Sequence, residues 1–236
     1  MQSFINAQPI SRYQWRVVIL CFLIVFLDGL DTAAMGFIAP ALSQDWGIDR
    51  ASLGPVMSAA LIGMVFGALG SGPLADRFGR KVVLVGAVLL FGAFSLASAY
   101  STNVDQLLVL RFLTGLGLGA GMPNATTLLS EYTPERKKSL LVTSMFCGFN
   151  LGMAGGGFIS AKLIPAFGWH SLLLIGGILP LILTVVLLFW LPESARYLVV
   201  RNRGTDKVRK ALAPIDPTVV AQASSFSVPE QKTVKA

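Results

Sequence analysis

The chain has 236 residues, of which 54% are apolar and 13% are charged, and its mean hydropathy is +0.68. Soluble globular domains usually carry about 25% charged residues, so this composition excludes an ordinary soluble domain and indicates a membrane protein. The net charge of +7 then reflects the placement of basic residues around a membrane, since no basic and aromatic patch points to nucleic acid.

Six segments are long enough and apolar enough to cross a bilayer, which takes about 20 residues of helix. We predict them at residues 17–42, 52–74, 82–100, 106–128, 139–165 and 169–191. Residues 1–16 form a cytoplasmic N-terminal segment. Residues 192–236 form a basic cytoplasmic segment that is helical in part at its start and otherwise a flexible loop.

The basic residues give the orientation of these spans. With the N-terminus in the cytoplasm, every Lys and Arg lies on the cytoplasmic side except Arg50, Arg111 and Lys162. Cytoplasmic loops of membrane proteins carry such an excess of basic residues. The first span is too long for the apolar core of a signal peptide, so we expect it to be retained.

Two carboxylates, Asp28 and Asp31, interrupt the first span. Their i, i+3 spacing puts both on one face of a helix, about 4.5 Å apart along its axis. A carboxylate at bilayer depth is costly unless it is protonated, paired or facing water, so the pair suggests proton or anion handling. A structural ion pair between helices is the alternative.

Glycines recur on the second, fourth and fifth spans, which is typical of closely packed helices in lipid. The only histidine, His170, and the two cysteines, Cys21 and Cys147, have no metal-ligand or catalytic spacing. We therefore predict neither a metal site nor an enzyme. An ion channel is also disfavoured, because no filter sequence is present.

Four short motifs accompany these spans. Gly72-Pro-Leu-Ala-Asp76-Arg-Phe-Gly-Arg-Lys81 is predicted as a ten-residue cytoplasmic hairpin between the second and third spans. The fourth span contains Arg111-x-x-x-Gly-x-Gly, and Glu131-x-x-Pro-x-Arg136 follows it. Pro192-Glu-Ser-Ala-Arg-Tyr-Leu198 follows the sixth span. By charge alone the hairpin could be an ordinary positive-inside loop.

Taken together, the four motifs resemble those of the major facilitator superfamily, with Ala195 in place of the usual proline in the last one. Within it, Asp28-Gly-Leu-Asp31-Thr resembles the aromatic acid:proton symporters. The resemblance implies an all-α membrane protein, the six-helix N-terminal half of a twelve-helix transporter built from inverted 3+3 repeats. We expect the chain to be a fragment that lacks the C-terminal six-helix half.

The resemblance also implies a function. It predicts proton-coupled import of aromatic carboxylates, such as 4-hydroxybenzoate or protocatechuate, across a bacterial inner membrane, with the proton as coupling ion and no other cofactor. Another small organic anion or metabolite as substrate, or a structural six-helix module that needs a partner half, are the alternatives. The loop motif identifies a fold and not a cargo.

Asp28, Asp31 and Arg111 are the candidate proton and substrate residues. At 1.5 Å per residue, Asp31 lies about 21 Å from the cytoplasmic start of its span, and Arg111 some 7–8 Å below the outer face. In a layer about 30 Å thick the two are roughly level, so we predict that they pair. A substrate carboxylate could then compete for the guanidinium and leave Asp31 free to take a proton.

The remaining candidates resemble the superfamily's cytoplasmic gate, in which an acid at a helix end and ion pairs separate when the gate moves. These residues are Gly72, Asp76, Arg77, Gly79, Arg80, Glu131 and Arg136.

Overall fold

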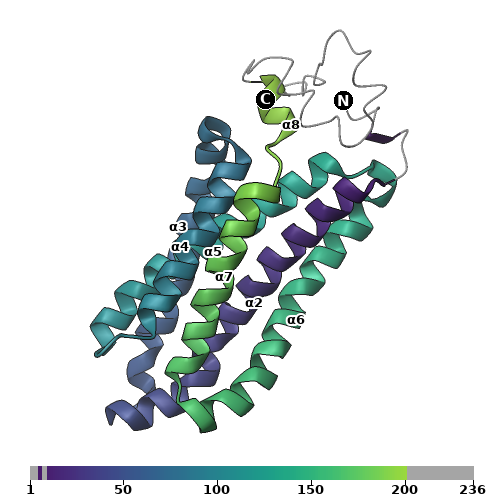
Figure 1. Cartoon of the computed structure of the whole chain (residues 1–236). Coiled ribbons are helices and arrows are strands. Elements are labelled where there is room, and N and C mark those ends of the chain that lie inside the picture. The colour runs from purple at the N-terminus through teal and green to yellow at the C-terminus, as the bar shows by residue number, and fades with distance from the viewer. Residues whose placement is uncertain (1–4, 7–9, 201–236) are drawn as a thin grey trace.

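The computed structural model describes residues 5–6 and 10–200. Its long helices are α2 (Arg12–Trp46), α3 (Gly54–Phe78), α4 (Arg80–Ser98), α5 (Val104–Tyr132), α6 (Glu135–Phe167) and α7 (His170–Trp190). They run side by side along the bundle (Figure 1). A 3-10 turn, η1 (Arg50–Leu53), precedes α3, and the short α8 (Ala195–Val200) follows α7. All six predicted spans are confirmed as helices of membrane-crossing length within the described residues.

Several helices extend beyond their predicted spans. The first begins at Arg12 rather than Val17, because Ser11 accepts a hydrogen bond from the Gln14 amide and the Gln14 side chain accepts one from the Ser11 amide. This reciprocal capping box fixes the start of a helix. Residues 12–16 therefore continue the first helix toward its N-terminus. Hydropathy locates the part of a helix that lies in lipid, but not its polar ends.

The predicted ten-residue hairpin at residues 72–81 is wrong. Helix α3 continues through Pro73 to Phe78, α4 starts at Arg80, and only Gly79 separates them. Gly79 has φ +103°, a backbone conformation that residues with a side chain rarely adopt. The chain therefore reverses direction at a single glycine, where the sequence predicted a longer loop.

The start of the segment after α7 packs against the bundle. In α8, Ala195 and Leu198 are buried in the apolar cluster that also contains α2 residues from Val17 to Leu27. The flexible loop predicted for the rest of the segment falls on residues 201–236, which lie outside the described residues.

Glycines bring the helices into backbone contact. On α5, a Cβ added at Gly119 would lie 2.0 Å from the Met64 carbonyl oxygen of α3, and on α6 a Cβ at Gly152 would lie 1.9 Å from the Phe26 carbonyl oxygen of α2. Lipid gives no hydrophobic drive for helices to associate, so close van der Waals contact between small residues must hold them together. The glycines thus set the spacing of the α3–α5 and α2–α6 pairs.

The apolar core is divided into two clusters along α2. One contains α2 residues from Val17 to Leu27, and the other contains α2 residues from Ala34 to Leu42. Asp28 and Asp31 lie between the clusters. The acids therefore belong to a polar layer inside the bundle, with apolar packing on both sides.

The start of α2, the α3–α4 and α5–α6 connections and α8 lie at one end of the bundle (Figure 1). The connections between α4 and α5 and between α6 and α7 lie at the other end. The helix ends and connections at the first end contain the basic residues Arg12, Arg16, Arg77, Arg80, Lys81, Arg136, Lys137, Lys138 and Arg196. It is the end that the sequence predicts to be cytoplasmic.

Candidate functional site

A buried ion pair joins α2 to α5. Arg111 Nη1 lies 3.1 Å from Asp31 Oδ2, and the two side chains are only 1% and 2% exposed. The structure thus confirms the predicted pairing of Asp31 and Arg111, which were estimated from the sequence to lie at about the same depth. Asp28, Asp31 and Arg111 are also the only charged residues buried among those the structure describes.

Two serines of α4 complete the surroundings of this pair. Ser95 Oγ donates a hydrogen bond to Asp31 Oδ1. Arg111 Nε donates to Ser98 Oγ at 3.3 Å, and Ser98 Oγ donates to the Phe94 carbonyl oxygen at 2.7 Å. Sequence reasoning missed both serines. Their i, i+3 spacing in an apolar span was the available signal, since it places two hydroxyls on one helix face.

Two polar atoms of the site are buried without a hydrogen-bond partner among the described residues: Asp28 Oδ2 and Arg111 Nη2. The other oxygen of Asp28 accepts a hydrogen bond from Thr32 Oγ1 at 3.3 Å. Buried polar atoms normally have partners, and leaving one unpaired is costly. The Nη2 group of Arg111 and one carboxylate oxygen of Asp28 are thus left without a partner among the described residues.

A cavity of about 250 Å³ opens beside the ion pair, between α2, α3 and α5. Its lining includes Asp31, Arg111 and three of the chain's methionines, Met35, Met57 and Met64. Thioethers make favourable contacts with aromatic rings. The cavity therefore has an apolar wall with a guanidinium at one side.

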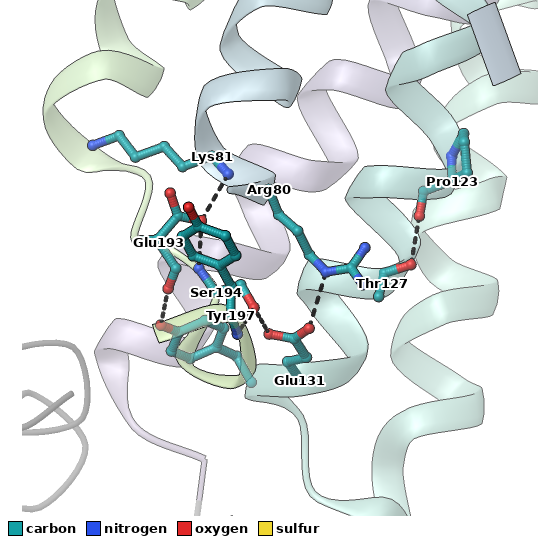
Figure 2. Close-up of polar contacts among 9 residues, drawn as sticks. Arg80, Lys81, Pro123, Thr127, Glu131, Glu193, Ser194 and Tyr197 are labelled. Atoms are coloured by element: carbon teal, nitrogen blue, oxygen red, sulfur yellow. Dashed lines mark hydrogen bonds and ion pairs between the residues drawn. The ribbon is translucent and has the colours of Figure 1, made fainter. Parts of the chain in front are cut away.

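A second cluster of polar contacts lies at the basic end of the bundle (Figure 2). Arg80 Nε lies 3.1 Å from Glu131 Oε1, and Ser194 Oγ donates to the other oxygen of Glu131. Glu193 Oε1 accepts from the Lys81 amide at 3.0 Å, at the N-terminus of α4, where a negative charge is favourable. The link from α7 to α8 thus joins the ends of α4 and α5.

A second cavity lies beside this cluster. Asp76, Arg80 and Glu131 line a cavity of about 550 Å³ together with Arg196 and Tyr197 of α8. Tyr197 Oη donates to the Arg77 carbonyl oxygen at 3.1 Å.

Gly79 faces the Glu193 carboxylate, so a Cβ there would lie 2.4 Å from Glu193 Oε2. Gly72 lies inside α3 and has no atom within 4 Å of an added Cβ, and Arg136 lies in the first turn of α6. The structure brings Arg80, Glu131 and Asp76 to one cavity and leaves Gly72 and Arg136 outside its lining. The sequence showed the motif that contains Glu193 and Ser194 but not their contacts with the helix ends.

Within the described part of the chain, no three His, Cys, Asp or Glu side chains are grouped so that they could hold a metal ion. The side chains at the buried site are those of the two acids, the guanidinium and the neighbouring hydroxyls.

Comparison with known proteins identifies the family. The model of the Major Facilitator Superfamily matches residues 21–228. The chain belongs to the major facilitator superfamily. It is 88% identical to the 4-hydroxybenzoate transporter PcaK of Pseudomonas putida and 84% identical to PcaK of Pseudomonas aeruginosa, with all of this chain and 53% of each relative covered. Both relatives are named as transporters.

A solved structure supports the same fold. The superfamily's proton:xylose symporter XylE, bound to 6-bromo-6-deoxy-D-glucose, matches with a TM-score of 0.77 at 23% identity, over 91% of this chain and 52% of that one. At this identity the likeness shows the fold alone. The chain spans about half the length of the curated relatives it matches. The predicted fold, a six-helix half of a superfamily transporter in a multi-pass membrane protein, is confirmed.

Proposed function

We propose that this chain forms one wall of a proton-coupled importer of aromatic carboxylates, with 4-hydroxybenzoate and protocatechuate as the first substrates to test. The substrate class is supported by the names of the two PcaK relatives. The single observation that carries the mechanism is the buried Asp31–Arg111 pair beside an apolar cavity, with Arg111 Nη2 unpartnered among the described residues.

In the proposed cycle, the substrate carboxylate binds Arg111 and displaces Asp31. A guanidinium is suited to this exchange because its planar fork can hold a carboxylate through two parallel hydrogen bonds. Once displaced, the Asp31 carboxylate lacks its counter-charge in a buried site, which favours proton uptake. One proton and one anion then move together. Release of both restores the ion pair.

Asp28 is proposed as a second proton or substrate site. It lies one helical turn from Asp31 and is 1% exposed, and its Oδ2 has no hydrogen-bond partner within the described residues. Two carboxylates this close disfavour each other's ionised form, so a proton bound at one of them affects the other.

The cluster around Arg80 and Glu131 is proposed as the cytoplasmic gate, together with Gly72, Asp76, Arg77, Gly79 and Arg136. The Arg80–Glu131 ion pair joins the α3–α4 turn to the end of α5 and lies beside an open cavity. An ion pair at this place can break and re-form when helices move against each other. We also propose that the transporter lies in a bacterial inner membrane with this end in the cytoplasm. The excess of basic residues at this end supports the orientation.

Uptake of radiolabelled 4-hydroxybenzoate tests the proposal. The full-length product of the gene is expressed in cells that lack aromatic acid transporters, and accumulation is measured with and without a proton gradient. We expect accumulation against the concentration gradient that stops when an uncoupler is added. Uptake that continues unchanged in the uncoupled cells would contradict proton coupling. Competition by excess unlabelled sugars, but not by excess unlabelled benzoates, would contradict the substrate class.

A further inference from the structure

Helix α4 has no charged residue near the ion pair, yet it contacts both members of that pair. Ser95 and Ser98 are each 0% exposed and lie on the same face of α4. Ser95 bonds the carboxylate of Asp31, and Ser98 bonds the guanidinium of Arg111. Each ion therefore has a polar contact that does not depend on the other ion.

Each member of the ion pair uses different atoms for its partner ion and for its serine. Asp31 uses Oδ2 for Arg111 and Oδ1 for Ser95, so breaking the ion pair leaves the Ser95 contact intact. Arg111 uses Nη1 for Asp31 and Nε for Ser98, so the guanidinium also keeps its position when Asp31 leaves. Nη1 and Nη2 then remain for a carboxylate, and they form one edge of the planar group.

The two serines suit different tasks. Ser98 Oγ donates its hydrogen to the Phe94 carbonyl oxygen, so its lone pairs face the guanidinium as a fixed acceptor. The hydroxyl of Ser95 bonds no acceptor other than Asp31 among the described residues, so no second acceptor fixes the direction of its hydrogen. A hydroxyl can donate to a carboxylate and, after rotation, accept from a carboxylic acid. Ser95 can therefore bond Asp31 in both of its protonation states.

We propose that Ser95 and Ser98 are positioning residues for coupled transport: Ser98 holds the Arg111 guanidinium in place for the substrate carboxylate, and Ser95 holds Asp31 through its protonation and deprotonation. The inference rests on the proposed function and adds residues to it that the family motifs do not contain. It gives α4 a role at the ion pair that was not predicted from the composition of this helix or from the motif at residues 72–81.

Asp31 has two charged neighbours among the buried residues that the structure describes, and its other neighbours named below are neutral. Its own helix contributes Asp28, and α5 contributes Arg111. From α7, Gly176 faces Asp31 Oδ1, with an added Cβ lying 3.4 Å from that oxygen, and α4 contributes Ser95. Ser95 is thus the neutral hydrogen-bonding side chain that contacts the Asp31 carboxylate, and its removal leaves one carboxylate oxygen without its contact.

Substitutions in the full-length gene product test the proposal. For Ser98→Ala we expect KM for 4-hydroxybenzoate to rise about tenfold, the worth of one hydrogen bond to a charged group. For Ser95→Ala we expect the pH midpoint of uptake to rise by about one pH unit, because a hydroxyl bonds an ionised carboxylate more strongly than it bonds the neutral acid. Ser95→Thr retains the hydroxyl and should restore the parental profile. Ser160→Ala is the matched control, because Ser160 is also a buried serine in a span but bonds only its own helix, at the Gly157 carbonyl oxygen.

A second readout does not depend on transport. Infrared spectra of the purified protein, recorded across a pH series, report the carboxylic acid band of Asp31, which Asp31→Asn identifies by its loss. We expect Ser95→Ala to shift this band and its titration, while Ser160→Ala leaves both as in the parent. If Ser95→Ala and Ser98→Ala match Ser160→Ala in KM, pH profile and infrared titration, the inference is wrong. If the parent fails to accumulate 4-hydroxybenzoate while the Ser95→Ala band still shifts, the proposed function fails and the role of Ser95 stands.

Discussion

At the scale of single residues, the charge of Arg111 is less important than its shape. Its Nη1 and Nε atoms bond two different helices, while Nη2 has no partner among the described residues. A lysine ammonium is a compact charge on a flexible stem and lacks this planar fork. An Arg-to-Lys change here keeps the charge but removes the geometry that distinguishes a carboxylate binding site from a simple counter-ion.

We therefore predict that Arg111→Lys reduces 4-hydroxybenzoate uptake by at least about 100-fold, since two charge-assisted hydrogen bonds are lost or misaligned. Uptake is measured per transporter, with the amount in the membrane determined by immunoblot. Arg50→Lys, at an exposed position in η1, is the control and should transport normally. Near-normal transport by Arg111→Lys would disprove the competition mechanism, and loss of the protein from the membrane would favour a purely structural ion pair.

The sequence predicted part of this site for a physical reason. Helix rise converts residue number into depth, so the sequence alone is enough to estimate that Asp31 and Arg111 lie at one level. Ser95 and Ser98 could not be found in this way, because a serine costs little inside a helix, where it can bond its own backbone. Their direction toward the ion pair depends on how α4 is rotated against α5, which is a property of the packed bundle.

At the scale of elements, hydropathy identified the six helices but not where they end. The reversal at Gly79 shows why: Gly72 and Pro73 resemble a loop in the sequence but lie inside α3. Proline is tolerated within helices of membrane proteins where neighbouring groups satisfy the backbone. The glycines of α3 and α5 were assigned to close packing from the sequence, but which helices they join became clear only from the bundle.

This packing gives a prediction for Gly119→Ala. The added Cβ would lie 2.0 Å from the Met64 carbonyl oxygen, so α3 and α5 must move apart, at a cost of about 1–3 kcal/mol. The midpoint of thermal unfolding in detergent should fall by several degrees. Gly86→Ala on α4 is the control, because nothing lies within 4 Å of its added Cβ and alanine favours helix more than glycine. An unchanged midpoint for Gly119→Ala would contradict close contact between α3 and α5.

At the scale of the whole molecule, the bundle supplies only some of the surfaces that a transport pathway needs. The cavity beside Asp31 and Arg111 is lined by α2, α3 and α5, and its lining on α3 includes Leu61, which is 59% exposed. Apolar side chains such as Phe66 on α3 and Phe158 on α6 are also exposed. Transporters of this superfamily bind substrate near the midplane, between two repeat-related halves. The matched relatives are about twice as long as this chain.

We therefore predict that residues 1–236, expressed alone, insert into the membrane but give no uptake of 4-hydroxybenzoate. Co-expression with the part of Pseudomonas putida PcaK that this chain does not cover should restore proton-dependent uptake, because the second half would close the cavity and supply the opposite wall. The chain with Arg111→Lys, co-expressed in the same way, is the matched control and should remain inactive although both halves are present. Saturable, uncoupler-sensitive uptake by the 236-residue chain alone would show that the second half is not needed for the pathway. The two co-expressed halves could also assemble in a pull-down and still give no uptake. That result would contradict the prediction, because it would show that transport requires more than assembly of the two separate halves.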